Sequence, residues 1–337
     1  MKYSLVLLSF VFLVNLHAQA QFSSQTGEPC YAKSEKRAKQ RFVEWECGNL
    51  VGVVDCNSKL EYDENLDVFF SRGSGSPYTG ECETCHNNGL REHRIRFLNG
   101  KEDGIDTTYY ESGCIRVIRS HAIGKEDGAW TYYYDSTARR AWVMNYMAGE
   151  KSGEHIYFGS GGDTTLWEFY QNGLLHGKKT SFYAGSKVKE EVHYKEGVLD
   201  GSFISYFPDG KISKRLNFKN GSKEGKQEYF YNNGAVLLVE NYSKDLKDGE
   251  FTTFFVNGDI QKRESYKKGR KEGAFVEYYP NGKLMSEFIY EKDELIDFRK
   301  YDEYGRLTEG TPQEGEGDED DALPGKKSKK KKSKKKK

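Results

Sequence analysis

Glycine recurs along this chain at an almost constant spacing of 24 residues, with a single spacing of 25. Self-similarity at a fixed period is the mark of a repeat architecture, in which each repeat buries its apolar surface against its neighbours. The glycines that begin the repeats are Gly80, Gly104, Gly128, Gly153, Gly177, Gly201, Gly225, Gly249 and Gly273. Positions within a repeat are counted from this glycine, which is position zero.

Two aromatic positions stay in phase with the glycines. At position five, eight of nine residues are aromatic, and Cys85 is the exception. At position seventeen, allowing one residue for the longer repeat, eight of nine are aromatic again, and His121 is the exception. Aromatic residues favour the pleated surface of a sheet, and glycine favours turns. The pattern therefore predicts β-structure over this part of the chain.

Positions eight and nine carry Asn-Gly, as in Asn233-Gly234, or a related pair. Such pairs suit a two-residue hairpin loop of the primed type, which needs positive φ at both positions. That loop sets position seven opposite ten, six opposite eleven and five opposite twelve. The aromatics at positions five and seventeen are then expected on opposite faces of the sheet.

A further glycine lies in the link between repeats, and Asp245 and Asp293 replace it twice. These residue types tolerate a left-handed backbone. We therefore predict an all-β fold, an extended single-layer antiparallel β-meander of about 9 hairpin repeats of 24 residues. The stretch from Phe298 to Glu309 is a degenerate repeat that we expect to close the array.

The chain divides into four segments by composition. Residues 1–20 are expected to be a signal peptide, because Lys2 precedes an apolar stretch and Ala18-Gln19-Ala20 offers a cleavage site. Residues 21–79 form the predicted cysteine-containing cap, 80–309 the hairpin repeat array and 310–337 a disordered tail. The mature protein is then exported to the periplasm or the cell exterior, where disulfides form.

The tail consists of an acidic block followed by a lysine block. Residues 314–321 hold six acids, and Lys326–Lys337 hold ten lysines. Such blocks bury no apolar surface and are typical of disorder. Two interpretations stay open: a solubilising tail that folds back on the acidic body, or salt-sensitive attachment to an anionic surface. We expect no specific nucleic-acid partner.

Repeats such as residues 201–224 and 273–290 resemble the MORN-repeat variant of bacterial proteins in the YwqK-type antitoxin family. The resemblance covers about residues 78–305. It implies an elongated β-sheet scaffold that binds proteins or, in eukaryotic relatives, lies near membranes, and it implies no catalytic residues. An antitoxin or immunity role remains an alternative, although a cytoplasmic role conflicts with the predicted export signal.

All six cysteines fall in the first third of the chain: Cys30, Cys47, Cys56, Cys82, Cys85 and Cys114. The predicted strand positions place Cys85 and Cys114 about 14 Å apart, beyond the ~7 Å that a disulfide spans. The remaining pairings are open. We predict that disulfides fasten the cap to the first repeat.

The string Cys82-Glu83-Thr84-Cys85-His86 matches the CxxCH pattern of c-type haem attachment. Strand alternation argues against haem, because it places Cys82 and Cys85 on opposite faces. A second alternative is a zinc or copper site formed by Cys82, His86 and His93, which a disulfide at Cys82 would abolish. We predict no cofactor.

The sequence contains no nucleophile elbow, phosphate loop or dense acid and histidine cluster, so we predict that the protein is not an enzyme. The favoured function is an exported scaffold that engages another protein or an envelope component, with an edge-strand homodimer as a further option. The alternative is a surface polysaccharide or other ligand that stacks on exposed tyrosines. The candidate tyrosines are Tyr110, Tyr134, Tyr183, Tyr231 and Tyr279.

Overall fold

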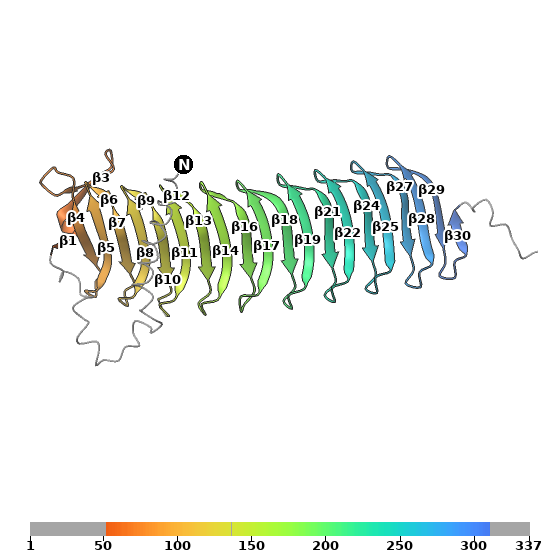
Figure 1. The fold of residues 1–337 in the computed structure, drawn as a ribbon, viewed down its shortest axis with the longest axis horizontal. Coiled ribbons are helices and arrows are strands. Elements are labelled where there is room, and N and C mark those ends of the chain that lie inside the picture. The colour runs from red at the N-terminus through yellow and green to blue at the C-terminus, as the bar shows by residue number, and fades with distance from the viewer. Residues whose placement is uncertain (1–51, 136, 311–337) are drawn as a thin grey trace, which may run out of the picture. The chain divides into compact units, whose positions relative to one another are not determined.

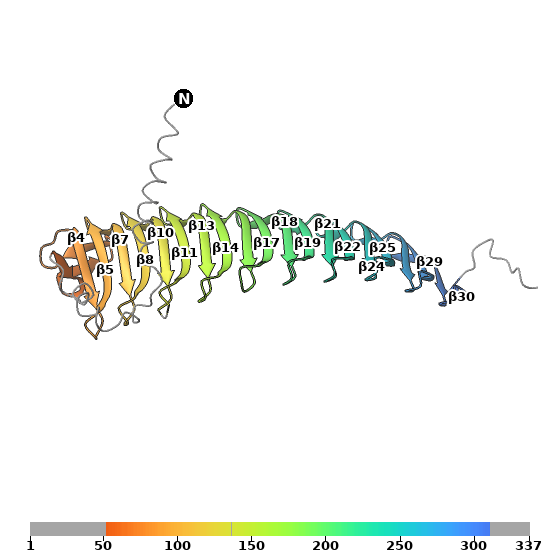
Figure 2. The same cartoon turned by 60° about the horizontal axis from the view of Figure 1, so that its bottom comes forward.

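The structure, a computed structural model, describes residues 52–135 and 137–310. Within them, α-helix is confined to one turn, α3 (Cys56–Lys59). The chain divides into two compact parts, an N-terminal part that ends at Gly234 and a C-terminal part that begins at Ala235. Each part is an open, single-layered antiparallel β-meander, as predicted (Figures 1 and 2).

The N-terminal part begins with a small cap. Strand β1 (Val53–Asp55) pairs in parallel with β4 (Gly80–Cys85) and so occupies the outer edge of the first repeat. Between them, β2 (Leu60–Asp63) and β3 (Val68–Ser71) form a separate hairpin. Leu60 from this hairpin packs with Cys82, Ile95 and Phe97 in a buried apolar cluster. The cap is thereby joined to the first repeat by packing as well as by pairing.

Each repeat supplies a long strand from its glycine, a hairpin loop, a second long strand, a tight link turn and a short strand. Consecutive strands pair antiparallel. After β4, those of the N-terminal part are β5 (Arg91–Leu98), β6 (Lys101–Glu102), β7 (Gly104–Tyr109), β8 (Ile115–Ala122), β9 (Lys125–Glu126), β10 (Gly128–Tyr133), β11 (Arg140–Met147), β12 (Glu150–Lys151), β13 (Gly153–Phe158), β14 (Thr164–Gln171), β15 (Leu174–Leu175), β16 (Gly177–Phe182), β17 (Val188–Lys195), β18 (Val198–Tyr206), β19 (Ile212–Lys219), β20 (Ser222–Lys223) and β21 (Gly225–Phe230).

The C-terminal part repeats the same unit. Its strands are β22 (Val236–Ser243), β23 (Leu246–Lys247), β24 (Gly249–Phe254), β25 (Ile260–Lys267), β26 (Arg270–Lys271), β27 (Gly273–Tyr278), β28 (Leu284–Glu291), β29 (Glu294–Tyr301) and β30 (Leu307–Gly310). The degenerate stretch therefore forms a further hairpin, β29–β30. Among the described residues, no helix has the length and apolarity needed to cross a membrane.

The hairpin loop differs from the predicted one. Position five lies opposite position eleven and not twelve, as Phe182 does opposite Val188. In most repeats, positive φ in the loop is confined to position nine, as at Gly282 with φ of 79°, whose N–H donates to Tyr279 O over 2.9 Å. This is a type I turn closed by a left-handed residue, which makes a bulge, and Pro280 fits its second position. The predicted register was therefore wrong by one residue next to the loop.

The primed turn lies instead in the link between repeats. Positions nineteen and twenty both have positive φ there, as in Asn220 (48°) and Gly221 (83°). The aspartate that replaces the link glycine behaves alike, with φ of 74° at Asp293. The expected left-handed backbone at the link is thus confirmed. The Gly221 N–H also donates to Leu199 O of the preceding repeat over 2.7 Å, so the turn bonds successive links together.

Beyond the bulge, the predicted register holds, with Gly177 opposite Tyr194 and Gly273 opposite Tyr290. Alternation along the strands then defines two faces. Face A carries positions two, four, thirteen, fifteen and seventeen, and face B carries positions one, three, five, fourteen and sixteen. The aromatics at positions five and seventeen therefore lie on opposite faces, as expected.

Candidate functional site

A row of aromatic rings runs along face A and forms the core of the C-terminal part. Positions seventeen and two alternate in it, with ring centroids 4.9–5.3 Å apart and steeply inclined planes. The rings are Tyr242, Phe251, Tyr266, Phe275 and Tyr290. The ammonium groups of Lys247 and Lys271 lie 4.4 and 4.5 Å from the Tyr266 and Tyr290 centroids, within cation–π range. This row is structural, because its rings pack on one another.

Position two is mixed in the N-terminal part, where polar residues such as Asp106 and His155 occur beside the aromatic Trp130 and Phe203. Asp106 is 1% exposed; its carboxylate contacts the His93 ring and pairs with the Arg119 guanidinium. His155 is fully buried between the rings of Tyr146 and Tyr170. The sequence did not identify position two as the buried position, because its residue types share no common chemistry.

The tyrosines at position six join successive hairpin loops. Each hydroxyl donates to the main-chain oxygen at position five of the next repeat, over 2.8 Å for Tyr110, 2.9 Å for Tyr134 and Tyr183, and 3.0 Å for Tyr279. Together with Tyr231, these side chains are half-buried. The candidate tyrosines thus occupy the same place in their hairpin loops, and the hydroxyls of Tyr110, Tyr134, Tyr183 and Tyr279 hold successive repeats together.

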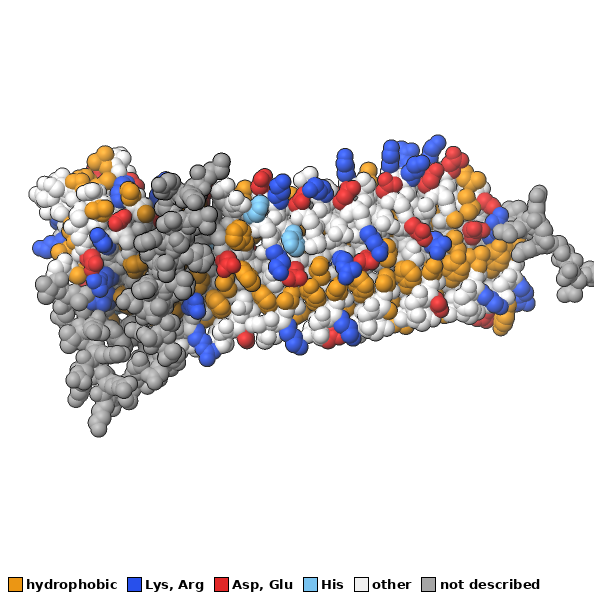
Figure 3. Space-filling view, in the orientation of Figure 1, with side chains coloured by type: hydrophobic (Ala, Val, Ile, Leu, Met, Phe, Trp, Pro, Cys, Tyr) orange, Lys and Arg blue, Asp and Glu red, His pale blue; other side chains and the backbone are white. Residues whose placement is uncertain are grey.

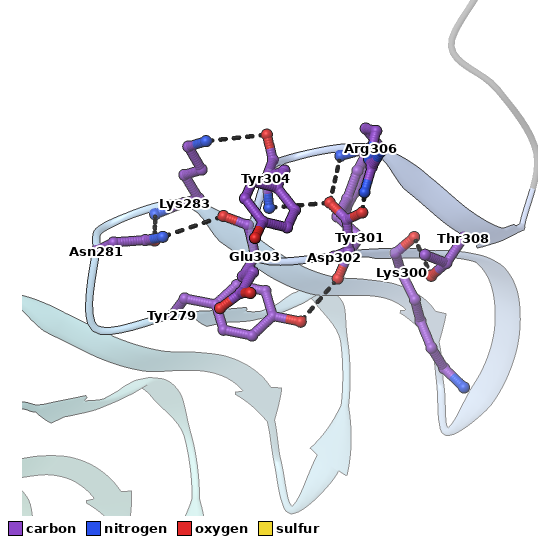
Figure 4. Close-up of polar contacts among 10 residues, drawn as sticks. All are labelled: Tyr279, Asn281, Lys283, Lys300, Tyr301, Asp302, Glu303, Tyr304, Arg306 and Thr308. Carbon is purple, nitrogen blue, oxygen red and sulfur yellow. Dashed lines mark hydrogen bonds and ion pairs between the residues drawn. The ribbon is translucent and has the colours of Figure 1, made fainter.

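Two further contacts strengthen the same loops, as Figure 4 shows for the last hairpin. The Asn281 amide donates to Glu303 O over 3.1 Å, and the Lys283 ammonium donates to Tyr304 O over 2.9 Å. The Asp302 carboxylate accepts from the backbone N–H groups of Tyr304 and Arg306 within its own loop. Side chains at three loop positions therefore satisfy backbone carbonyls of the following repeat.

The haem-like string is part of a disulfide-bonded strand. Cys82 is bonded to Cys56, with their Cα atoms 5.1 Å apart, and this bond joins the cap to the first repeat. Cys85 is also in a disulfide, and so is Cys114. Cys30 and Cys47 lie outside the described residues. The Cys82 sulfur is therefore engaged and does not serve as a thioether or metal ligand here.

The two histidines of the metal hypothesis also have other partners. His86 Nε2 lies 3.0 Å from Tyr109 O and takes the place of a position-six tyrosine. His93 Nε2 contacts the Asp106 carboxylate on face A. Among the described residues, no group of three or more histidine, cysteine or acidic side chains is arranged to hold a metal ion. The structure does not bring Cys82, His86 and His93 together as a site.

A hollow of about 350 Å³ lies at the link edge of the N-terminal part. It is lined by Gln171, Asn172, Leu174, His176 and Glu196. Gln171 is the last residue of β14, and two exposed aromatic side chains, Trp167 and Phe169, precede it at alternate positions of the same strand. No sequence motif marks these residues, although Trp167 and Phe169 differ from the residue types at positions fourteen and sixteen of the other repeats.

Comparisons with known proteins bear on the repeat. Residues 175–196, 199–220 and 271–292 match the family model described as MORN repeat variant. A comparison with curated proteins gave no match. The match concerns the type of repeat and does not extend to an antitoxin role.

Solved structures of low similarity were also found. The crystal structure of TcdB2-TccC3 is 10% identical over 74% of this chain and 17% of that chain, with a TM-score of 0.15. The crystal structure of TcdB2-TccC3-Cdc42 is 9% identical over 66% of this chain and 15% of that chain, with a TM-score of 0.13. The chain spans less than a fifth of those chains, and TM-scores this low carry no structural inference. From the family match and the hairpin register together, the chain contains repeats of the MORN variant type.

Proposed function

We propose that the protein is an exported, non-catalytic scaffold whose β-meander binds another protein. Repeats of the MORN type generally serve as scaffolds that bind proteins or membranes, and they are a non-catalytic repeat type. The specific role proposed here goes further, to a protein partner outside the cytoplasm.

The observation that carries the proposal is the single layer of the sheet. Most sheets bury at least one face against helices or a second sheet. Beyond the first repeat, where the cap packs on Cys82, Ile95 and Phe97, both faces are open in the described residues of each part, and no described helix covers them. In Figure 3, hydrophobic side chains gather in stripes over β13–β19 and over β24–β29. Apolar side chains on an open face favour contact with another macromolecule.

Loop bonding makes these faces suitable for binding. The tyrosine, asparagine and lysine contacts between successive loops fix each repeat against the next, as for Tyr183 to Tyr206 O. A surface that is ordered before binding loses less conformational entropy when a partner arrives. The repeated hairpin therefore favours recognition by a preformed surface.

Proximity labelling with a biotin ligase fused to the mature chain tests the proposal. We expect one protein to be enriched over a control fusion that carries the signal peptide alone. The same protein should be retained by the purified mature chain in vitro. Enrichment of no protein above that control would contradict the scaffold function.

The export step rests on the predicted signal peptide, which lies outside the described residues, and on the Cys56–Cys82 disulfide. Structural disulfides persist in oxidising compartments. Cell fractionation followed by mass spectrometry of the intact protein tests this step. We expect a mature chain that begins at Gln21 and lies outside the cytoplasm, whereas an unprocessed cytoplasmic chain would contradict it.

A further inference from the structure

The repeat that begins at Gly153 departs from all others on face B. Trp167 at position fourteen and Phe169 at position sixteen are 42% and 39% exposed. No other repeat has Phe, Tyr or Trp at either position, where Arg215, Arg263 and Ser265 are typical. The fold therefore does not require aromatic residues at these places. Two adjacent aromatic rings that remain this exposed need an explanation other than the common fold.

The link of the same repeat departs as well. In four repeats, an acidic residue at position twenty-three accepts the N–H of position nineteen in the next repeat, as Asp200 does from Asn220 over 3.1 Å. In the repeat that begins at Gly153, position twenty-three is His176 instead of an acidic residue, and position nineteen of the next repeat is Glu196. The acceptor for the Glu196 N–H is therefore replaced by an imidazole. Both side chains line the hollow of about 350 Å³. A structural contact has been replaced by polar groups that face an open space.

The aromatic pair and the hollow form one continuous surface. Trp167, Phe169 and Gln171 lie at alternate positions of β14, so their side chains point to the same face, and Gln171 lines the hollow. In the described part of the chain, no hydrogen bond or ion pair engages the side chains of Gln171, Asn172, His176 or Glu196. In Figure 3, hydrophobic and histidine side chains lie near one another over β14–β17.

We propose that this surface binds an uncharged oligosaccharide. The rings of Trp167 and Phe169 offer flat apolar surfaces for the C–H faces of sugar rings. The amides of Gln171 and Asn172 and the side chains of His176 and Glu196 supply donors and acceptors for hydroxyl groups. No lysine or arginine lines the hollow, and Glu196 is its one acidic side chain, so an anionic ligand is disfavoured. The site is independent of the protein-scaffold proposal.

Binding of the full mature chain to a microarray of uncharged oligosaccharides tests the site. We expect binding that falls at least about tenfold in Trp167→Arg and in Phe169→Ser, the effect of losing one central aromatic contact. Gln171→Lys should weaken it as well. All three changes install residues that other repeats carry at the same positions, as Arg263, Ser265 and Lys219 do, so the fold is retained.

Val239→Arg is the matched control, because it installs the same residue at position fourteen of another repeat, where no aromatic ring is lost. It should leave glycan binding unchanged. Absence of binding to any uncharged glycan would overturn the proposal. So would equal binding by Trp167→Arg and the unmodified chain, or a loss of binding in Val239→Arg as large as that in Trp167→Arg. Binding to a peptide array that Trp167→Arg abolishes, without glycan binding, would assign the surface to a peptide instead.

Discussion

His155 is a buried polar residue in a row that is otherwise aromatic over much of the array. Its Nε2–H donates to Asn145 O over 2.9 Å, while Nδ1 is buried without a partner. The same position carries phenylalanine in later repeats, where Phe251 and Phe275 pack between two tyrosine rings. His155 packs between Tyr146 and Tyr170 in the same manner. We therefore expect His155→Phe to fit the site and to stabilise the fold.

The magnitude follows from the hydrogen bonds gained and lost. Removing the unsatisfied Nδ1 should gain about 1–3 kcal/mol, and losing the bond to Asn145 O should cost about 0.5–1.5 kcal/mol. Asn145 O remains satisfied in the variant, because it also accepts the Ser152 N–H over 2.8 Å. We expect a net increase of about 1 kcal/mol in the local free energy of unfolding at pH 7.5.

The advantage should grow in acid. Burial lowers the pKa of His155 below its ordinary value of 6.5, and the nearby charge of Lys151 lowers it further, although the Asn145 carbonyl and Glu168 oppose the shift. The unfolded chain therefore binds a proton that the folded chain resists. The stability that neutral His155 contributes is complete above pH 6.5 and is lost as pH falls from there to the folded pKa. Phenylalanine removes this loss.

Hydrogen exchange of β13 and β14, measured by mass spectrometry at pH 7.5 and 5.5 and corrected for intrinsic exchange rates, tests both expectations. Hydrogen exchange reports the opening of individual strands, whereas a global unfolding experiment on a repeat array averages over all repeats. The difference in opening free energy between His155→Phe and the unmodified chain should be positive and larger at pH 5.5. A variant that exchanges faster at pH 7.5, or a difference that does not depend on pH, would refute the reasoning.

Three further predictions concern the link, the cap and the tail. Gly221→Ala should lower the free energy of unfolding by about 1–2 kcal/mol, because residue 221 has a positive φ, and Gly221→Asn should lower it less. Urea unfolding of both variants measures this, and equal stability of Gly221→Ala and the unmodified chain would contradict the turn assignment. Replacing Cys56 and Cys82 by alanine removes a cross-link with a sequence separation of 26 and should destabilise the cap by about 2–4 kcal/mol. The melting temperature of the cap should fall, and an unchanged temperature would show that packing alone fastens it. Salt-sensitive binding to anionic lipid vesicles should be lost when residues 326–337 are deleted. If such binding survives the deletion, the repeat array and not the tail is responsible for it.

The repeat boundaries and the sidedness of the sheet follow from the sequence. The glycine period predicted one hairpin for each repeat, and the alternation along the strands placed the rings at positions five and seventeen on opposite faces. Local chemistry was sufficient here, because glycine marks the turns and aromatic residues mark the pleated surface.

The prediction placed the primed turn at the hairpin loop, whereas the structure has it at the link. Asn-Gly suits a primed turn, but it also suits a type I turn followed by a left-handed glycine, and the link residues Asn220 and Gly221 adopt the primed geometry. Pro280 was the available signal, because its fixed φ suits a type I turn. A proline preceding Asn-Gly therefore distinguishes the two loops.

The candidate site was less accessible to sequence reasoning. The tyrosine hydroxyls bond to the next repeat, as Tyr183 does to Tyr206 O, and this contact depends on how repeats stack. The hollow beside Gln171 depends on the link turn and has no local motif. Trp167 and Phe169 were detectable only by comparing equivalent positions of the repeats, since neither belongs to a short pattern of its own.

Interchangeable hairpins, each fixed in register, are the central claim of this account. Deleting residues 201–224 removes one full period of 24 residues and brings Gly225 into the place of Gly201, whereas deleting residues 201–212 removes half a period. Far-UV circular dichroism with urea unfolding of both variants tests the claim most directly. We predict that the full-period deletion keeps the β-sheet spectrum and a cooperative transition, while the half-period deletion loses both. Equal loss of structure in the two variants would contradict the account.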